Sequence, residues 1–176
     1  MIIMTTSLNG WPVPPKKLKL FKVAGADRRL TLDKDAGRAL AALASDYHKT
    51  VRAIDKGKVD DGGYNDRDAA GAPGRKSNHA SGTAIDLNWS EEGAMGSNWG
   101  KKFFSDVKNI AKVSAIKKRY SPIIQWGGDW RAKDYMHWEI KPGVTRQQVI
   151  DFCKKNNIDE NGVRKDGNGG GGGSSF

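Results

Sequence analysis

The chain has 176 residues, with 30 Lys and Arg against 20 Asp and Glu, which gives a formal net charge of +10. This length suits one domain with a real core, and the charge favours a polyanionic partner, whether nucleic acid, anionic lipid or a cell-wall polymer. Cys153 is the only cysteine, which excludes an internal disulfide and a Cys-rich zinc site, so a metal centre would need His and carboxylate ligands.

Residues 1–30 are expected to form an N-terminal extension that packs on the domain or leads into it. The chain begins without a signal-peptide pattern, and nowhere does it hold the roughly twenty apolar residues that span a membrane. WPVPPKK (residues 11–17) is proline-rich and basic. KLKLFKV (17–23) alternates charged and apolar side chains, which predicts a short edge strand.

A helix is predicted from Leu32 to about Ile54, because apolar side chains recur there every three or four residues. Thr31 or Asp33 could cap its start. The stretch 56–78 is rich in Gly, Pro, Asp and Asn, and we expect it to be mostly loop. Long loops within compact domains are often binding or active-site elements.

In the second half of the chain, three short strands are predicted: TAIDLNW (83–89), PIIQW (122–126) and YMHWEI (135–140). Two helices are also predicted, one over 98–118 that stops before Ser121-Pro122 and one that begins at a Thr145–Gln148 capping box. The fold class is therefore α+β, a small and mostly antiparallel sheet flanked by helices. The domain is expected over 31–158. The glycine-rich segment 159–176 is expected to be a linker or tail.

His79 and Asp86 are candidate ligands because the small residues Ala80, Ser81 and Gly82 let the chain turn between them. Asp86 lies in an otherwise apolar strand, where a carboxylate is costly unless it is paired or binds a cation. On spacing alone, a salt bridge to a lysine or arginine explains it equally well. His48, late in the first predicted helix, has no acidic or Gly-rich context and is assigned a structural or surface role.

YMHWEI places His137 and Glu139 on one face of a strand, with Glu139 able to orient the imidazole. Two neutral imidazoles and one carboxylate form a ligand set suited to catalytic zinc, with a fourth position for water. Asp134, three residues before His137, could accept a proton from that water. A turn-forming Asp is the alternative for this residue.

At this point the motifs resemble a known family. The pattern S-x-H-x-x-G-x-A-x-D, followed by WGGDW and by His-Trp-Glu, resembles the zinc D-Ala-D-Ala carboxypeptidases, which include the vancomycin-resistance dipeptidases. It is most similar to the phage-endolysin branch, the L-alanyl-D-glutamate peptidases. The resemblance spans roughly residues 30–155. It implies a hedgehog/D,D-peptidase-like fold, one zinc ion bound by His79, Asp86 and His137, and Asp134 as general base and acid.

The family also uses an arginine after a Gly-Tyr pair to hold substrate and stabilise the oxyanion. In this chain Tyr64 and Arg67 fit that pattern, although two residues separate them, and Arg75 is the competing candidate. Ser77 is expected to shape the loop near the site. Trp126 and Trp130 are assigned to the wall of the cleft, with core packing an equal alternative.

The resemblance leads us to expect a zinc peptidase that cuts an amide in the stem peptide of bacterial peptidoglycan, most similar to an endolysin catalytic domain cutting L-Ala-D-Glu. A D-Ala-D-Ala carboxypeptidase or dipeptidase and a zinc-containing wall-binding module without catalysis are the alternatives. The expected partner is peptidoglycan, with no nucleic acid, no membrane insertion and a monomeric state. We expect synthesis in the host cytoplasm, action on the wall, and a wall-binding module once linked to the tail.

Overall fold

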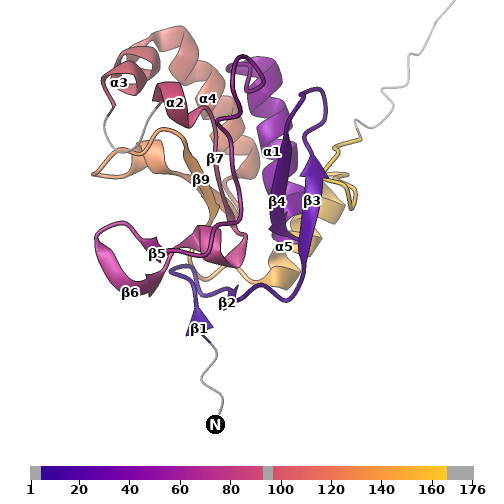
Figure 1. Ribbon diagram of the computed structural model, residues 1–176. Helices are drawn as coiled ribbons and strands as arrows, with labels where there is room; N and C mark the ends of the chain where they lie inside the picture. Colours follow the sequence, from indigo (N-terminus) through magenta and orange to yellow (C-terminus); the bar gives the residue numbers. More distant parts are fainter. Residues whose placement is uncertain (1–4, 93–96, 166–176) are drawn as a thin grey trace, which may run out of the picture.

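The computed structural model describes residues 5–92 and 97–165 and has an α+β architecture, as the sequence predicts (Figure 1). Its central sheet has three antiparallel strands in the order β7-β9-β8. Three two-stranded antiparallel sheets, β1–β2, β3–β4 and β5–β6, lie around it. The strands are β1 (Thr5–Thr6), β2 (Pro12–Val13), β3 (Leu18–Lys22), β4 (Arg29–Asp33), β5 (Asp68–Ala69), β6 (Ala72–Lys76), β7 (Ala84–Asp86), β8 (Ile124–Trp126) and β9 (His137–Ile140).

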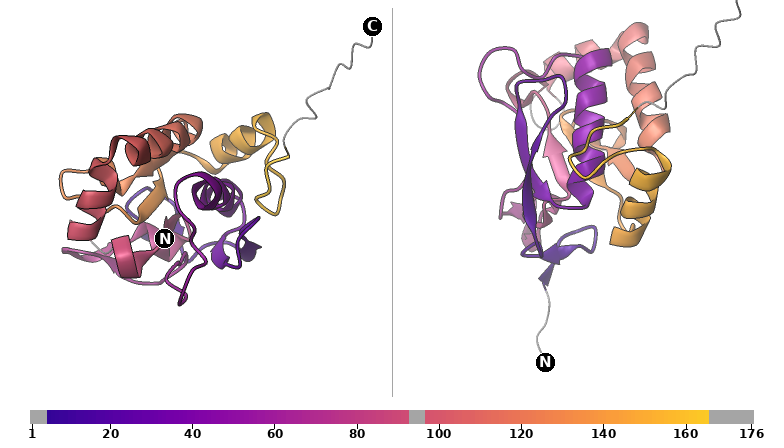
Figure 2. Two further views of the ribbon diagram at one scale, coloured as in Figure 1. Left: turned by 90° about the horizontal axis from the view of Figure 1, so that it is seen from above. Right: turned by 90° about the vertical axis from the view of Figure 1, so that its right-hand side faces the viewer.

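The helices are α1 (Ala36–Thr50), α2 (Trp89–Glu92), α3 (Asn98–Ser105), α4 (Val107–Tyr120) and α5 (Arg146–Lys155), with 3-10 turns η1 (Asn78–Ser81) and η2 (Gly127–Asp129). Helix α1 is central, since it contacts α4, α5, the β3–β4 hairpin and β9. The view from above in Figure 2 shows α4, α5 and the hairpin arranged around it. No helix within the described ranges is both long and apolar enough to cross a membrane.

Small residues let α1 approach the β3–β4 hairpin closely. A side chain at Gly37 would place its Cβ 2.2 Å from the Phe21 ring, so only glycine allows this contact. The rest of the buried face carries Leu40, Leu43 and Tyr47, and Tyr47 meets Trp138 of β9 edge to face. The core therefore lies between α1 and one face of the central sheet, which leaves the opposite face free for a site.

The first predicted helix begins later than its pattern indicates. Leu32 belongs to β4, where Leu30 and Leu32 are buried while Arg29 and Thr31 are exposed. This alternation of buried and exposed residues is typical of a strand, and in the sequence it merges with the helical spacing that follows. The helix ends at Thr50 rather than near Ile54.

Asp33, an expected cap, does accept hydrogen bonds from the backbone N–H groups of Asp35 and Ala36 at the helix start. Strand β4 also includes residue 30, the predicted boundary between the N-terminal extension and the domain.

The predicted helix over 98–118 is two helices, because Asp106 interrupts it and caps α4 through hydrogen bonds from the backbone N–H groups of Lys108 and Asn109. The expected end before Ser121-Pro122 is confirmed. The capping box of Thr145 and Gln148 is also confirmed.

The predicted loop of 56–78 contains the β5–β6 hairpin. Residues 159–165, assigned to the tail from composition, are tied to α1 by hydrogen bonds from the Arg164 guanidinium to both carboxylate oxygens of Asp46, at 2.7 and 3.0 Å.

Candidate metal centre

Strand register places Asp86 and His137 face to face. The two residues are direct partners in the antiparallel pairing of β7 with β9, and such partners project from the same face of a sheet. The Asp86 carboxylate is 2.9 Å from Nδ1 of His137. Both side chains lie on the sheet face that the core does not use, whereas Trp138 between His137 and Glu139 points into the core.

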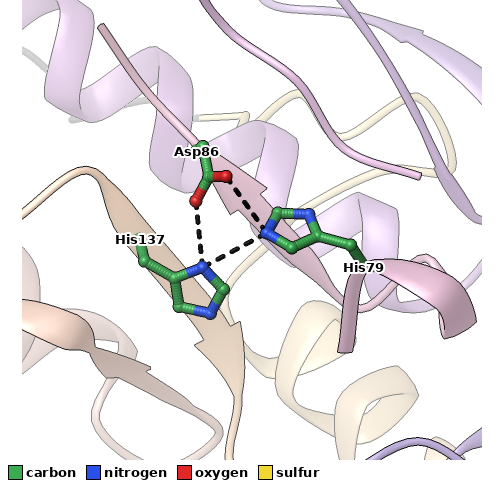
Figure 3. A group of neighbouring side chains, drawn as sticks. All are labelled: His79, Asp86 and His137. Atoms are coloured by element: carbon green, nitrogen blue, oxygen red, sulfur yellow. Dashed lines mark hydrogen bonds and ion pairs between the residues drawn. The ribbon is translucent and has the colours of Figure 1, made fainter. Parts of the chain in front are cut away.

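His79 joins them from η1. The Ser77 hydroxyl accepts the His79 backbone N–H at the start of this turn, and Gly82, with a φ of 68°, ends it in a left-handed conformation that favours glycine. His79 Nε2 lies 3.2 Å from the Asp86 carboxylate and 3.2 Å from Nδ1 of His137 (Figure 3). Ligand atoms from the three residues all lie within 4.8 Å of one another.

The outward-facing nitrogens of both rings are held by acceptors. His79 Nδ1 is 2.7 Å from the backbone oxygen of Gly63, which can only accept, so this nitrogen carries the proton. His137 Nε2 is 2.7 Å from the Glu139 carboxylate. In their neutral forms, the two imidazoles would therefore turn lone pairs toward the Asp86 carboxylate. Three acceptors meet at one point, an arrangement that repels itself unless a proton or a metal ion lies between them.

The electrostatics of the group follow from this geometry. Burial opposes a charge on His137, but its hydrogen bonds with Asp86 and Glu139 outweigh burial and raise the pKa of the imidazole to about 10. Burial likewise disfavours a charged Asp86, yet hydrogen bonds from the two histidines hold the pKa of this carboxylate well below its usual range. Without metal, the group therefore retains a proton.

Glu139 is fixed by two amides that the sequence did not suggest. Asn78 Nδ2 and Gln125 Nε2 each donate to one oxygen of the Glu139 carboxylate at 2.7 Å. Burial raises the pKa of Glu139, but these bonds and His137 outweigh it and lower the pKa overall. In the sequence, the only sign that Asn78 belongs to the site is its position next to His79. The partnership of Gln125 required the register of β8 with β9.

A buried polar network lies behind this loop. Asn9 donates its backbone N–H to Asn78 at 2.9 Å, and its side-chain amide donates to Thr83 at 2.8 Å and to the Ile140 carbonyl at 3.0 Å. The Ser7 hydroxyl bonds to Asn9 at 2.7 Å and to Ser81 at 2.8 Å. The N-terminal segment thus supports the loop that carries His79.

Asp134 lies at the edge of the group. Its backbone oxygen accepts the His137 N–H at 3.3 Å, and its own N–H donates to Gly127 at 3.0 Å. Gly127 must lack a side chain, because a Cβ would stand 2.4 Å from the Asp134 backbone oxygen. Within the described part of the chain, the buried Oδ1 of Asp134 has no hydrogen-bond partner. Burial raises the pKa of this carboxyl above its usual range, and the nearby His137 offsets only part of the rise.

The remaining expected residues fall into different places. Arg67 is exposed and its guanidinium donates to the Asp68 carbonyl at 3.3 Å; in the described residues no hydrogen bond or ion pair joins it to the His79–Asp86–His137 group. Arg75 is also exposed. Tyr64 is half-buried and its backbone N–H donates to Thr31. The structure therefore does not bring the arginines into contact with the candidate metal ligands.

Trp126 is a core residue, which corrects its assignment to the cleft wall. It pairs with Trp138 across β8 and β9, so its side chain points to the core face, and only 3% of its surface is exposed. Trp130 instead lies beside His137, with ring centroids 5.2 Å apart, and remains partly exposed. Trp130 therefore remains a candidate for the cleft wall.

Comparison with known proteins supports the reading of these motifs. Residues 70–140 match the family model described as D-alanyl-D-alanine carboxypeptidase. Over this segment, the chain is similar to that peptidase family. The matched residues include His79, Asp86, Asp134 and His137, whereas Tyr64 and Arg67 precede them. Searches of curated proteins and of solved structures found no match.

Proposed function

We propose that this peptidase uses one zinc ion, held by His79, Asp86 and His137. The observation that carries the proposal is the convergence of His79 Nε2, His137 Nδ1 and the Asp86 carboxylate. The other ring nitrogen of each histidine points away from this centre, toward an acceptor oxygen. A set of two imidazoles and one carboxylate fits zinc in catalytic sites, where three protein ligands leave one position open. The hydrogen-bonded carboxylate and carbonyl behind the two imidazoles are also typical of zinc sites.

A zinc ion bound here would supply Lewis acidity, which acidifies water and polarises a scissile carbonyl. Asp134 is the residue we assign to proton transfer, taking a proton from the attacking water and giving it to the leaving amine. Its raised pKa suits this role, since a general base that also acts as an acid works best when its pKa approaches the working pH. The partnerless Oδ1 leaves the carboxylate an open acceptor.

We further propose that the substrate is the stem peptide of bacterial peptidoglycan, cut at the L-Ala-D-Glu bond, as in an endolysin catalytic domain. The order of the two motifs supports this branch, and the net charge of +10 suits an anionic wall. Arg67 is retained as the substrate-holding cation and Arg75 as its alternative, because both guanidinium groups are exposed and accessible to a negatively charged ligand.

A second candidate is removal of terminal D-Ala, because the matching family model carries the description D-alanyl-D-alanine carboxypeptidase. The two activities share the same ligands and differ in the loops that line the cleft. A wall-binding module without catalysis is disfavoured, since such a module would not need the half-buried Asp134 close to His137.

The test is digestion of purified peptidoglycan by the zinc-loaded protein, with and without a chelator, followed by mass spectrometry of the new termini. Termini at L-Ala and D-Glu that appear only without the chelator support the endopeptidase. Loss of terminal D-Ala identifies the second candidate instead. An unchanged wall would contradict both activities.

Two variants separate metal binding from proton transfer. Asp134→Asn should keep zinc and lose activity by about 10²–10⁴-fold, the usual contribution of a general acid–base residue. His137→Ala should lose the metal. Asp129→Asn is the matched control, because this exposed aspartate of the same connection pairs with Lys117 instead. Full activity in Asp134→Asn would show that another group transfers the proton.

A further inference from the structure

Trp89 lies beside the metal ligands, although neither its spacing nor the family motifs single it out. It follows Asp86 by three residues, and 42% of its surface is exposed. Its backbone N–H donates to the Asp60 carbonyl at 2.9 Å, and Asn88 before it adopts a left-handed φ of 54°. These features turn the backbone sharply out of β7 and fix the backbone position of Trp89.

The indole rests on Gly62, which continues the sheet beyond β7. Gly62 and Asp86 exchange two backbone hydrogen bonds, at 3.0 and 2.9 Å, so they form an antiparallel pair whose side-chain directions share one face. A ring carbon of Trp89 is 3.0 Å from the point that a Cβ on Gly62 would occupy. Trp89 therefore covers the Gly62 backbone on the same face as the Asp86 carboxylate.

Two indoles consequently stand on opposite sides of the ligand group. Trp89 lies over Gly62, one strand beyond Asp86, while Trp130 contacts His137 from the β8 side. Neighbouring strands lie about 4.8 Å apart, so the strand of Gly62 and β9 are separated by about 10 Å. An extended peptide advances about 3.3 Å per residue, so about three residues would span the distance from the Gly62 strand to β9.

We propose that Trp89 forms a substrate subsite, at which its exposed indole face packs against the apolar part of the stem peptide on the His79 side of the scissile amide. Trp130 bounds the other side. An indole held in one orientation offers a large apolar surface with little loss of side-chain entropy on binding. This subsite rests on the proposed function, because it takes the stem peptide as the ligand.

The experiment measures peptide binding separately from cleavage. In the zinc-loaded Asp134→Asn background, calorimetry with a soluble stem peptide gives Kd without turnover. We expect Trp89→Ala to weaken binding about tenfold, the scale of one buried aromatic contact, and Trp89→Phe to restore most of the loss. In the otherwise unaltered protein, Trp89→Ala should raise KM more than it lowers kcat. Zinc content should stay unchanged.

Trp99→Ala is the matched control, because this similarly exposed tryptophan of α3 stacks on Phe103 and lies under the Arg52 guanidinium, away from the Gly62 strand. Its Kd should equal that of the background. Equal Kd values for Trp89→Ala and Trp99→Ala would overturn the subsite, as would a background that binds no stem peptide. Binding that depends on Trp89, combined with no cleavage by the active protein, would support the subsite and reject the proposed reaction.

Discussion

His137 uses its two ring nitrogens for different purposes. Nε2 bonds to Glu139, while Nδ1 faces His79 and Asp86, so the imidazole links a fixed carboxylate to the centre of the group. The raised pKa of His137 means that the metal-free protein holds a proton where the acceptors converge. A metal ion bound by this group would therefore compete with a proton for one position.

Zinc binding should consequently release protons and strengthen as the pH rises. The folded-state pKa of His137, about 10, lies above the usual value of 6.5, so the imidazole is protonated at pH 7 and must lose that proton to bind metal. Calorimetry at pH 7 in two buffers with different ionisation enthalpies should report about one proton released per zinc. His48→Gln, which alters a histidine outside the group, should leave that number unchanged.

The same shift predicts how the stability of the metal-free protein depends on pH. A raised pKa contributes stability that is complete below about 6.5 and disappears as the pH rises toward 10. Chemical denaturation of the metal-free protein should thus show a free energy of unfolding that falls across this range. If the heat of zinc binding were the same in both buffers, zinc and a proton would not compete for the His137 imidazole.

At the scale of elements, the break between α3 and α4 orients the aromatic side chains behind the site. Phe104 near the end of α3 stacks on Tyr135 and meets Trp126 edge to face. Asp106 then starts α4 in a new direction. The packing of this break therefore supports the connection that leads into β9.

Asp106→Ala should lower the free energy of unfolding by about 1 kcal/mol, the usual cost of losing an N-cap side chain. Asp106→Asn should retain most of the stability, because an asparagine oxygen can accept the same backbone N–H groups. Urea denaturation measures both variants. A zinc content that fell along with stability in Asp106→Ala would show that the cap also shapes the metal centre.

A feature could be predicted from the sequence when it depends on residues close together in the chain, and not when it depends on contacts between distant segments. His79, Asp86 and His137 were predictable, because a histidine or carboxylate among small or apolar residues stands out locally. The break at Asp106 was not, since a polar residue fits the exposed side of a continuous helix equally well. Trp126 and Trp130 look alike in sequence, and only the register opposite Trp138 places Trp126 in the core.

At the scale of the whole molecule, residues near the N-terminus and residues beyond position 70 form one polar interior. Ser7 and Asn9 bond to Ser81, Asn78 and Thr83, which surround His79. No local pattern announced this network, because serines and asparagines are common in exposed turns. Their burial could be known only from the fold.

Asn9→Ala should weaken both folding and metal binding. It leaves the Ile140 carbonyl without the Asn9 amide and removes the partner of Thr83, and each buried group deprived of its partner costs about 1–3 kcal/mol. Zinc affinity should fall about tenfold, as for other groups that orient ligands. Leu8→Ala, which alters an exposed neighbour, is the control. Thermal denaturation and zinc titration test both variants, and unchanged zinc affinity in Asn9→Ala would limit the network to folding.

This network also determines which segments must be transferred together if the site is moved into another protein. Residues 70–140 contain all three proposed ligands and Asp134. However, the backbone N–H that bonds to Asn78 comes from Asn9, and the oxygen that fixes the His79 tautomer comes from Gly63. Grafting that segment alone into another scaffold, or exchanging it between relatives, would carry the ligands across without the groups that aim them. A chimaera built for new specificity should therefore keep residues 5–9 and 60–64 together with the segment that it transfers.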